Sequence, residues 1–239
     1  MKKYRKEDLE SYTLGTTLTM ELLNKKVEYV KRIYIHSKLE HNETYLKMIE
    51  ICKNNNIEVI ESDKTINGLS DKDNCYMIGV FSKFKEEIDY KSNHIVLVNP
   101  SNMGNLGTII RSSIGFGINN LVIIKPGVDI FDPKVIRSSM GAIFNLKFKY
   151  YDSFGEYLKE FDNRDYYPFM LKAKTNLKDV VINNKYSLIF GPEASGLDDT
   201  YLEVGTPLII KHSKKIDSLN LDNAVSIALY EFTKNNEFK

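Results

Sequence analysis

The stretch LIFGPEASGLDD, residues 188–199, decides the fold class of the second half of the chain. It opens with an apolar run that ends at Phe190 and then enters a loop between Gly191 and Gly196. A short, continuous apolar run is typical of a strand buried in a parallel sheet. Because open α/β sheets bind ligands at the carboxyl ends of such strands, Glu193 in this loop is a candidate site residue. An alternative stays open, in which Glu193 stands in a helix's first turn, where the dipole favours negative charge.

Similar apolar runs flank this stretch on both sides. Helical patterns separate most of them, and this alternation predicts an α/β unit with a parallel sheet. The predicted strands are residues 94–98, 121–125, 167–171, 187–190 and 207–210. The last segment, Leu219 to Phe232, carries its apolar residues on one helical stripe. We expect it to close the unit as an amphipathic helix.

The segment NPSNMGNLGTIIRSSIGFG, residues 99–117, follows the first of these strands and leads into a helix. Its glycines and asparagines, Asn105 among them, predict a tight turn whose backbone amides can approach a ligand. Arg111 follows about one and a half helical turns later. The spacing is neither the GxGxxG dinucleotide fingerprint nor a phosphate loop, because no Gly-Lys-Ser/Thr is present. An ordinary structural turn with a surface arginine fits these residues equally well.

A third segment, IDSLNLDNAVSIALYEF, residues 216–232, places Ser218, Leu219 and Asn220 directly before the final helix. Ser218 can serve as an N-cap and Asn220 as a donor or acceptor in the first turn. Each of the three segments is weak by itself. Their occurrence as three strand-end loops in one unit, in this order, is far more specific.

The chain before residue 88 shows a smaller α/β pattern. Helical spacing around residues 14–22 and 45–52 alternates with strand-like runs at 32–36 and 57–60. Residues 82–93, SKFKEEIDYKSN, are polar and lack a sustained apolar period, which is typical of a linker. We therefore place two domains at residues 1–88 and 89–239.

The charge balance is nearly even, with 33 basic against 32 acidic residues, so any contact with nucleic acid must be local. Two small basic clusters are candidates for such a local contact with nucleic acid, although an ordinary solvent-exposed surface explains either one alone. They are Lys2, Lys3, Arg5 and Lys6, and Lys211, His212, Lys214 and Lys215.

The cysteine count and the hydropathy pattern bound the class of protein further. Cys52 and Cys75 are too few for a disulfide framework or a zinc site, and we expect no metal. The sequence has no run of about 18 apolar residues, and its start lacks the apolar stretch of a secretion signal. We expect a cytoplasmic protein that does not enter a membrane.

With these three segments in place, the chain resembles the SpoU or TrmH-like RNA ribose methyltransferases of the SPOUT class. The resemblance covers residues 93–235 and extends through PKVIRSSMGAIF, residues 133–144. The segments YTLGTTLTMELL and VKRIYIHSKL, within the first 40 residues, are similar to the small ribosomal-protein-like substrate-binding domain of many members.

The resemblance implies a fold, a cofactor and an assembly. The fold is α/β, with a parallel sheet whose C-terminal segment forms a trefoil knot, a rare topology. The knot forms the pocket for S-adenosylmethionine, and Gly191, Ile210 and Leu219 would line it. The family works as homodimers with the active site at the subunit interface.

The resemblance also implies the reaction, a methyl transfer from S-adenosylmethionine to a ribose 2'-hydroxyl of structured RNA. The implied catalytic residues are Asn105, Arg111, Glu193, Ser218 and Asn220. We expect Arg111 to hold the substrate phosphate and to stabilise the developing alkoxide, because a guanidinium normally stays protonated. Whether the proton leaves to the phosphate or to a transiently neutral arginine stays open. Many relatives have a small residue where this chain has Asp222.

Three alternatives remain at this point. The first is an RNA-binding protein that keeps the fold without catalysis. The second is a nucleotide-dependent oxidoreductase, which predicts the dinucleotide fingerprint that is missing. The third is a SPOUT enzyme that methylates a base. Ribosomal RNA is favoured over transfer RNA as the substrate by analogy, because an additional N-terminal unit suits a bulky folded target.

Overall fold

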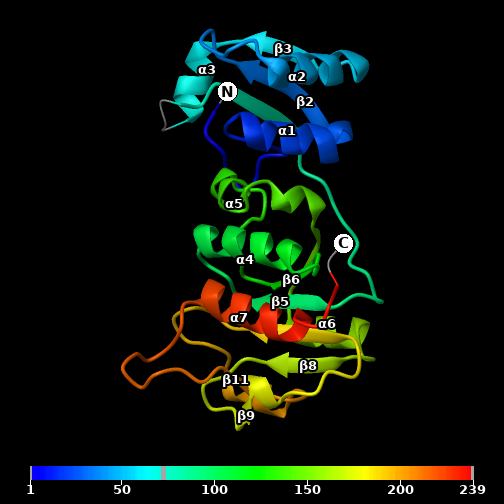
Figure 1. Cartoon of the computed structure of the whole chain (residues 1–239), viewed down its shortest axis with the longest axis vertical. Helices are drawn as coiled ribbons and strands as arrows, with labels where there is room; N and C mark the ends of the chain where they lie inside the picture. The colour runs from blue at the N-terminus through cyan, green and yellow to red at the C-terminus, as the bar shows by residue number, and fades with distance from the viewer. Residues whose placement is uncertain (1, 71–73, 238–239) are drawn as a thin grey trace. The chain divides into compact units, whose positions relative to one another are not determined.

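The computed structural model describes residues 2–70 and 74–237 of the chain (Figure 1). Its internal contacts divide the chain into two compact units. Unit 1 comprises Met1–Phe84 together with Asp129–Asn145, and unit 2 comprises Lys85–Val128 together with Leu146–Lys239. Each unit has its own sheet and its own core, so each is described by itself.

Unit 1 is built on a four-stranded sheet with strand order β1-β4-β2-β3. β2 pairs parallel with β3 and antiparallel with β4, and β1 pairs antiparallel with β4. The strands are β1 (Glu10–Tyr12), β2 (Val30–Ile35), β3 (Glu58–Glu61) and β4 (Met77–Ser82). The helices are α1 (Thr16–Lys25), η1 (Val27–Tyr29), α2 (Glu43–Asn54), α3 (Asp63–Leu69), α5 (Pro133–Ser138) and η2 (Ala142–Asn145).

The segment 129–145 packs inside unit 1 although its sequence neighbours belong to unit 2. Gly141 has a φ of 82°, and a Cβ added there would meet the Glu21 side chain of α1 at 2.9 Å. Ser11 donates a buried hydrogen bond of 2.5 Å to the carbonyl of Phe131. Close backbone approach and buried hydrogen bonding therefore hold this segment in unit 1.

Unit 2 contains a five-stranded sheet with order β7-β6-β5-β10-β8, in which every neighbouring pair is parallel. The strands of this unit are β5 (His94–Val98), β6 (Asn120–Ile124), β7 (Lys147–Tyr151), β8 (Asp165–Pro168), β9 (Thr175–Asn176), β10 (Tyr186–Phe190) and β11 (Leu208–Ile209). The helices are α4 (Met103–Gly115), α6 (Phe154–Glu160), η3 (Leu177–Asp179), η4 (Asp199–Glu203) and α7 (Leu221–Thr233). The predicted α/β class with a parallel sheet is confirmed.

One edge strand was not predicted from sequence. β7 has the sequence KFKYY, in which lysines alternate with aromatic residues. Polar residues are tolerated there because β7 pairs with β6 alone, which leaves its other edge outside the sheet. The continuous apolar run that marks a central strand is therefore absent from β7.

Helices α4 and α7 pack against each other in unit 2 (Figure 1). Ser226 on α7 donates a hydrogen bond of 3.1 Å to Ser112 on α4. Asn102 caps α4, because its side chain accepts from the backbone N–H groups of Gly104 and Asn105. Helix α7 begins at Leu221 with Asn220 at its N-cap position, so Ser218 lies before the cap and does not serve as one.

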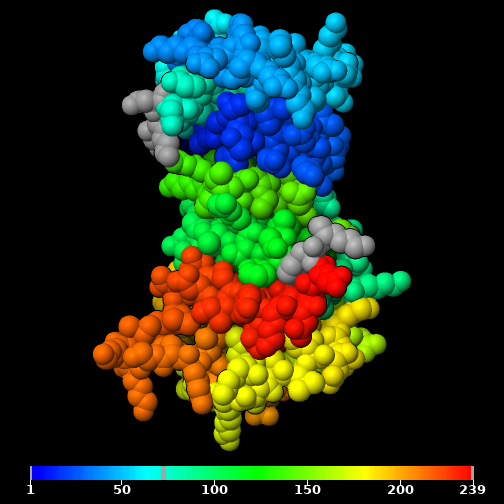
Figure 2. All heavy atoms as spheres, in the orientation of Figure 1, coloured from blue at the N-terminus to red at the C-terminus, as the bar shows by residue number. Residues whose placement is uncertain are grey.

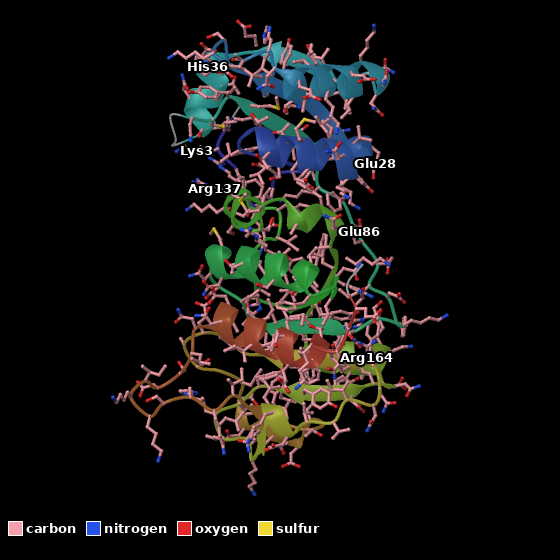
Figure 3. The ribbon with its side chains drawn as sticks, viewed as in Figure 1. Lys3, Glu28, His36, Glu86, Arg137 and Arg164 are labelled. Carbon is pink, nitrogen blue, oxygen red and sulfur yellow. The ribbon has the colours of Figure 1, made fainter. Side chains whose placement is uncertain are left out.

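A buried polar network lies at the amino-terminal ends of β5 and β10. The ring of His94 contacts the Tyr157 hydroxyl at 2.8 Å, and that hydroxyl lies 2.6 Å from the Ser187 hydroxyl. Arg164, labelled in Figure 3, donates to Ser187 and to the carbonyl of Tyr90. Burial lowers the pKa of His94 to about 4, and the nearby Arg164 charge adds to this shift. The imidazole is therefore neutral at physiological pH.

The described residues form neither a membrane-spanning helix nor a metal-binding cluster. None of their helices is long and apolar enough to cross a membrane. They also contain no group of three or more histidine, cysteine, aspartate or glutamate side chains placed to hold a metal ion. Cys52 and Cys75 are both buried free thiols.

Candidate functional site

A cavity of about 670 Å³ lies in unit 2, beyond the carboxyl ends of β8 and β10. Its walls come from four stretches, within residues 169–172, 190–199, 208–212 and 217–224. The second and fourth stretches belong to two of the three segments singled out from sequence. Pockets of about 300–1,000 Å³ enclose ligands of nucleoside or drug size. The topology of the sheet thus creates a ligand site where open α/β folds place theirs.

Gly191 shapes this cavity because the chain folds back on it. A Cβ added at Gly191 would lie 2.3 Å from the carbonyl carbon of Gly196 and 2.4 Å from the nitrogen of Leu197. Gly196 itself has a φ of 68°, in the left-handed region that favours glycine. Glu193 lies in the turn between the two glycines, not in a helix, which decides against the helical alternative. The two glycines therefore allow a tight loop whose backbone faces the cavity.

Glu193 connects this loop to helix α4. The side-chain amide of Asn105 donates a hydrogen bond of 2.8 Å to the Oε1 atom of Glu193. Asn105 lies in the first turn of α4, directly after Asn102 has fixed the start of that helix. The first and second sequence segments are thus joined at the rim of the cavity.

The charges of the cavity lining are mostly negative. The described residues of the lining include the charged groups Lys172, Glu193, Asp198, Asp199 and Asp217. Lys172 pairs with Asp199 at 2.7 Å, and Glu193 accepts the hydrogen bond from Asn105. Asp198 accepts from the backbone N–H of Thr200 at 2.9 Å. This excess of carboxylates favours a ligand that carries positive charge.

Five of the eight predicted site residues line the cavity. They are Gly191, Glu193, Ile210, Ser218 and Leu219. Asn105 reaches the rim through Glu193. Asn220 holds the N-cap position of α7 and makes no side-chain capping bond. The structure therefore brings most of the predicted residues together.

Arg111 is the predicted residue that stands apart. It is exposed on α4, it does not line the cavity, and its side chain makes no hydrogen bond or ion pair with a described residue. Six residues of α-helix separate it from Asn105, a rise of about 9 Å. Its guanidinium is consequently available to a molecule that approaches from outside.

The structure adds lining residues that sequence reasoning did not assign. Phe169 and Phe190 stack with ring centroids 4.5 Å apart and planes at 10°, and both line the cavity. The half-buried ring of His212 also lines it, with Nδ1 3.0 Å from the carbonyl of Ile210. Both phenylalanines lie within or beside predicted strands. Their position at the carboxyl end of a strand could therefore have identified them as lining residues from the sequence.

The residues of the site lie within the part of the chain that matches a known protein family. The model of the SpoU rRNA Methylase family matches residues 92–230 of the chain, which includes the first two segments and the third as far as residue 230. A Listeria monocytogenes protein assigned as a tRNA (cytidine(34)-2'-O)-methyltransferase is 31% identical over 152 residues, covering 61% of this chain and 89% of its own length. The site thus belongs to a methyltransferase, and the chain is a member of the SpoU rRNA methylase family.

Solved structures share the fold over nearly the whole chain. The rRNA methyltransferase of Sinorhizobium meliloti is 19% identical with a TM-score of 0.83, and the match covers 98% of this chain and 90% of that one. AviRb from Streptomyces viridochromogenes, in complex with AdoMet, is 19% identical with a TM-score of 0.82, covering 95% of this chain and 90% of its own. These likenesses show that the chain shares the fold of the two methyltransferases.

The cavity's chemistry fits S-adenosylmethionine. The stacked pair of Phe169 and Phe190 gives an apolar wall for a purine. The loop backbone around Gly191 offers polar groups at close approach. Asp198 and Asp217 provide negative charge for the donor's sulfonium and ammonium groups. The size, apolar surface and charge of the cavity thus agree with this ligand.

Proposed function

We propose that the chain transfers a methyl group from S-adenosylmethionine to a ribose 2'-hydroxyl of structured RNA in the cytoplasm, with ribosomal RNA as the favoured substrate. The observation that carries this proposal is the hydrogen bond between Asn105 and Glu193. It joins the first family segment to a cavity lined by the other two.

The proposed roles of the residues follow from their positions. Gly191, Ile210 and Leu219 line the cavity and would hold the donor, and the bound donor would supply the electrophilic methyl group. Asn105 and Glu193 would orient groups at the rim, Ser218 would contact the ligand from the cavity lining, and Asn220 would fix the start of α7. Positioning of this kind supplies much of the rate of a displacement reaction.

Arg111 is proposed to act on the RNA and not on the donor. Its planar guanidinium can hold a phosphate beside the target ribose with two hydrogen bonds. The same positive charge stabilises the oxygen as its proton leaves. The exposed position of Arg111 and its lack of a described partner support this role.

A homodimer is part of this proposal. Ile227 and Tyr230 on α7 are 41% and 60% exposed, although both are large apolar or aromatic residues. Phe116, at the end of α4, lies with its ring 6.5 Å from that of Tyr230. Such a patch is typical of a subunit interface. In a dimer Arg111 would complete the active site at that interface.

The domain roles and the knot are also proposed. Residues 1–88 would bind the RNA substrate, and residues 89–239 would form the knotted methyltransferase domain. The threaded segment would carry β11 and α7. Among solved structures, the one described for 2-OH methylation of C/U34 on tRNA matches 60% of this chain, whereas the S. meliloti rRNA methyltransferase matches 98% of it. This difference supports ribosomal RNA as the substrate.

A methyl-transfer assay tests the proposal. Unmodified ribosomal RNA and unmodified transfer RNA transcripts are incubated separately with the protein and tritiated S-adenosylmethionine, and the nucleosides are then separated. We expect 2'-O-methylnucleosides from the ribosomal RNA, and at least about 100-fold less label with Arg111→Ala. Label on a base would show a base methylase. RNA binding without any label would favour the RNA-binding protein that lacks catalysis.

A further inference from the structure

The segment between β11 and α7 forms an exposed turn beside the cavity. Its two ends line the cavity, His212 on one side and Asp217 with Ser218 on the other. Between them, the N–H of Ile216 bonds to the carbonyl of Ser213 at 3.4 Å, which closes a β-turn. In Figure 2 this orange segment before α7 stands out from the surface of unit 2.

Lysines occupy both corners of this turn. Lys214 and Lys215 are its two central residues, and Ser213 accepts from the N–H of Lys215 at 3.2 Å. Corner positions are dominated by glycine, proline, asparagine, aspartate and serine, so the turn itself does not call for lysine. Lys211 lies just before the turn, and all of these lysines are exposed. We refer to Lys211 and residues 213–216 as the lysine turn.

The described carboxylates do not pair with these lysines. No ion pair within 4.0 Å joins Lys211, Lys214 or Lys215 to a described acidic group, whereas Lys172 at the same cavity pairs with Asp199 at 2.7 Å. Three long cationic side chains thus remain available beside the cavity mouth. Ile216, 50% exposed, adds an apolar surface next to them.

Acidic side chains line the cavity, and the lysines of the turn lie outside its lining. The acidic side chains include Glu193, Asp198 and Asp217. A cationic donor is favoured inside, but the same carboxylates repel a polyanion at the mouth. The whole chain has a formal net charge of +1, so it offers little long-range attraction to compensate. Local cations outside the rim are the groups that can bring RNA to the mouth.

We propose that the lysine turn is a phosphate clamp that binds the RNA backbone next to the nucleotide being methylated. This inference rests on the proposed function and adds a positioning surface to it. Lys211, Lys214 and Lys215 contact phosphates, and Ile216 packs against an adjacent base. The flexible lysine ammonium groups suit a strand whose sequence varies, because phosphates carry no sequence information.

Binding measurements at several salt concentrations test the clamp. The probe is a fluorescein-labelled unmodified ribosomal RNA transcript, titrated with wild type and with Lys211→Gln/Lys214→Gln/Lys215→Gln. The slope of log K against log[salt] is negative, and each lost phosphate contact makes it shallower by about 0.7 on single-stranded RNA. We therefore expect the magnitude of the slope to decrease by about 2 in the triple variant. The affinity should fall about 10- to 100-fold at moderate salt.

A matched triple variant controls for the change in net charge. Lys91, Lys159 and Lys185 are exposed residues of unit 2 that do not line the cavity. Lys91→Gln/Lys159→Gln/Lys185→Gln removes the same charge and should keep the wild-type slope. In steady-state assays, the lysine-turn variant should raise the KM for RNA and keep its kcat. Its affinity for S-adenosylmethionine, measured by calorimetry, should also be unchanged.

Two outcomes would overturn the clamp. One is a lysine-turn variant with the wild-type salt slope, and the other is a control variant that lowers the slope equally. The proposed function fails separately, if wild type transfers no methyl group. In that case the salt slopes still decide whether the lysine turn contacts RNA.

Discussion

Asn105 in the first turn of α4 donates a hydrogen bond of 2.8 Å to Glu193, which lies 88 residues later in the loop after β10. This contact ties a helix N-terminus to the loop that forms one wall of the cavity. Because the acceptor is a carboxylate, the bond is stronger than one between neutral groups. Solvent exposure of the pair reduces that advantage.

A double-mutant cycle measures this coupling. Asn105→Ala, Glu193→Ala and the double variant should show a coupling energy of about 1 kcal/mol in the activation free energy of methyl transfer. Single-turnover kinetics give the three rates relative to wild type. Strictly additive effects would show that the two side chains act independently.

Gly191→Ala should remove the binding of S-adenosylmethionine. The new Cβ would lie 2.3 Å from the backbone of Gly196, so the loop must shift away from the cavity wall. We expect a loss of affinity of at least about 100-fold and a destabilisation of about 1–3 kcal/mol, since overpacking a filled space costs about this much. Calorimetry and urea unfolding give both values.

Gly155→Ala is the control for that substitution. Gly155 lies in α6, and a Cβ there would have the Ser153 hydroxyl as its nearest neighbour, at 3.8 Å. Stability should change by less than about 1 kcal/mol, and cofactor affinity should stay at the wild-type value. If both variants bind the cofactor normally, the loop does not form the cofactor wall.

Arg111→Lys should slow methyl transfer about tenfold or more without weakening cofactor binding. The lysine keeps the charge but lacks the planar pair of donors that holds a phosphate. Arg111 does not line the cavity, so the dissociation constant of the cofactor should not change. Turnover at saturating RNA is the decisive measurement, and an undiminished kcat in this variant would count against the proposed role.

Stability should fall between about pH 6.5 and pH 4 because of His94. Burial lowers its pKa from 6.5 in the unfolded chain to about 4 in the folded protein. Across this window the unfolded state binds more protons, so the free energy of unfolding decreases as the pH falls. The full effect is about 3 kcal/mol.

The variant His94→Gln isolates that contribution. An amide can still meet the Tyr157 hydroxyl and the carbonyl of Asp89, which are the two partners of the imidazole. Urea unfolding at pH 7.5 and at pH 5 measures how much the free energy of unfolding decreases between these two pH values. This decrease should be about 2 kcal/mol smaller in His94→Gln than in wild type. Equal losses in the two proteins would mean that His94 does not titrate with unfolding.

The sequence predicted the central strands because their apolar runs are local signals. His94–Val98 and Tyr186–Phe190 match predicted strands to within one residue, and all five of their residues are buried. The final helix was also predicted, although it starts at Leu221 because Asn220 has an extended backbone. Such elements can be predicted from the sequence because the pattern of buried apolar residues is visible among neighbouring positions.

The remaining features depend on contacts between distant segments. The place of residues 129–145 in unit 1 follows from the approach of Gly141 to α1, which no local pattern contains. The stacking of Phe169 on Phe190 likewise needs β8 and β10 to be neighbours in the sheet. Five of the eight candidate residues that the resemblance implied line one cavity, whereas the exposed position of Arg111 emerged only from the structure.

A crystal structure of the protein with S-adenosylmethionine tests the central claim most directly. We predict density for the cofactor in the cavity, against Gly191, Ile210 and Leu219, with its methyl group directed toward the rim where Asn105 meets Glu193. Cofactor density elsewhere, or an empty cavity at saturating cofactor in a protein that still methylates RNA, would contradict the account.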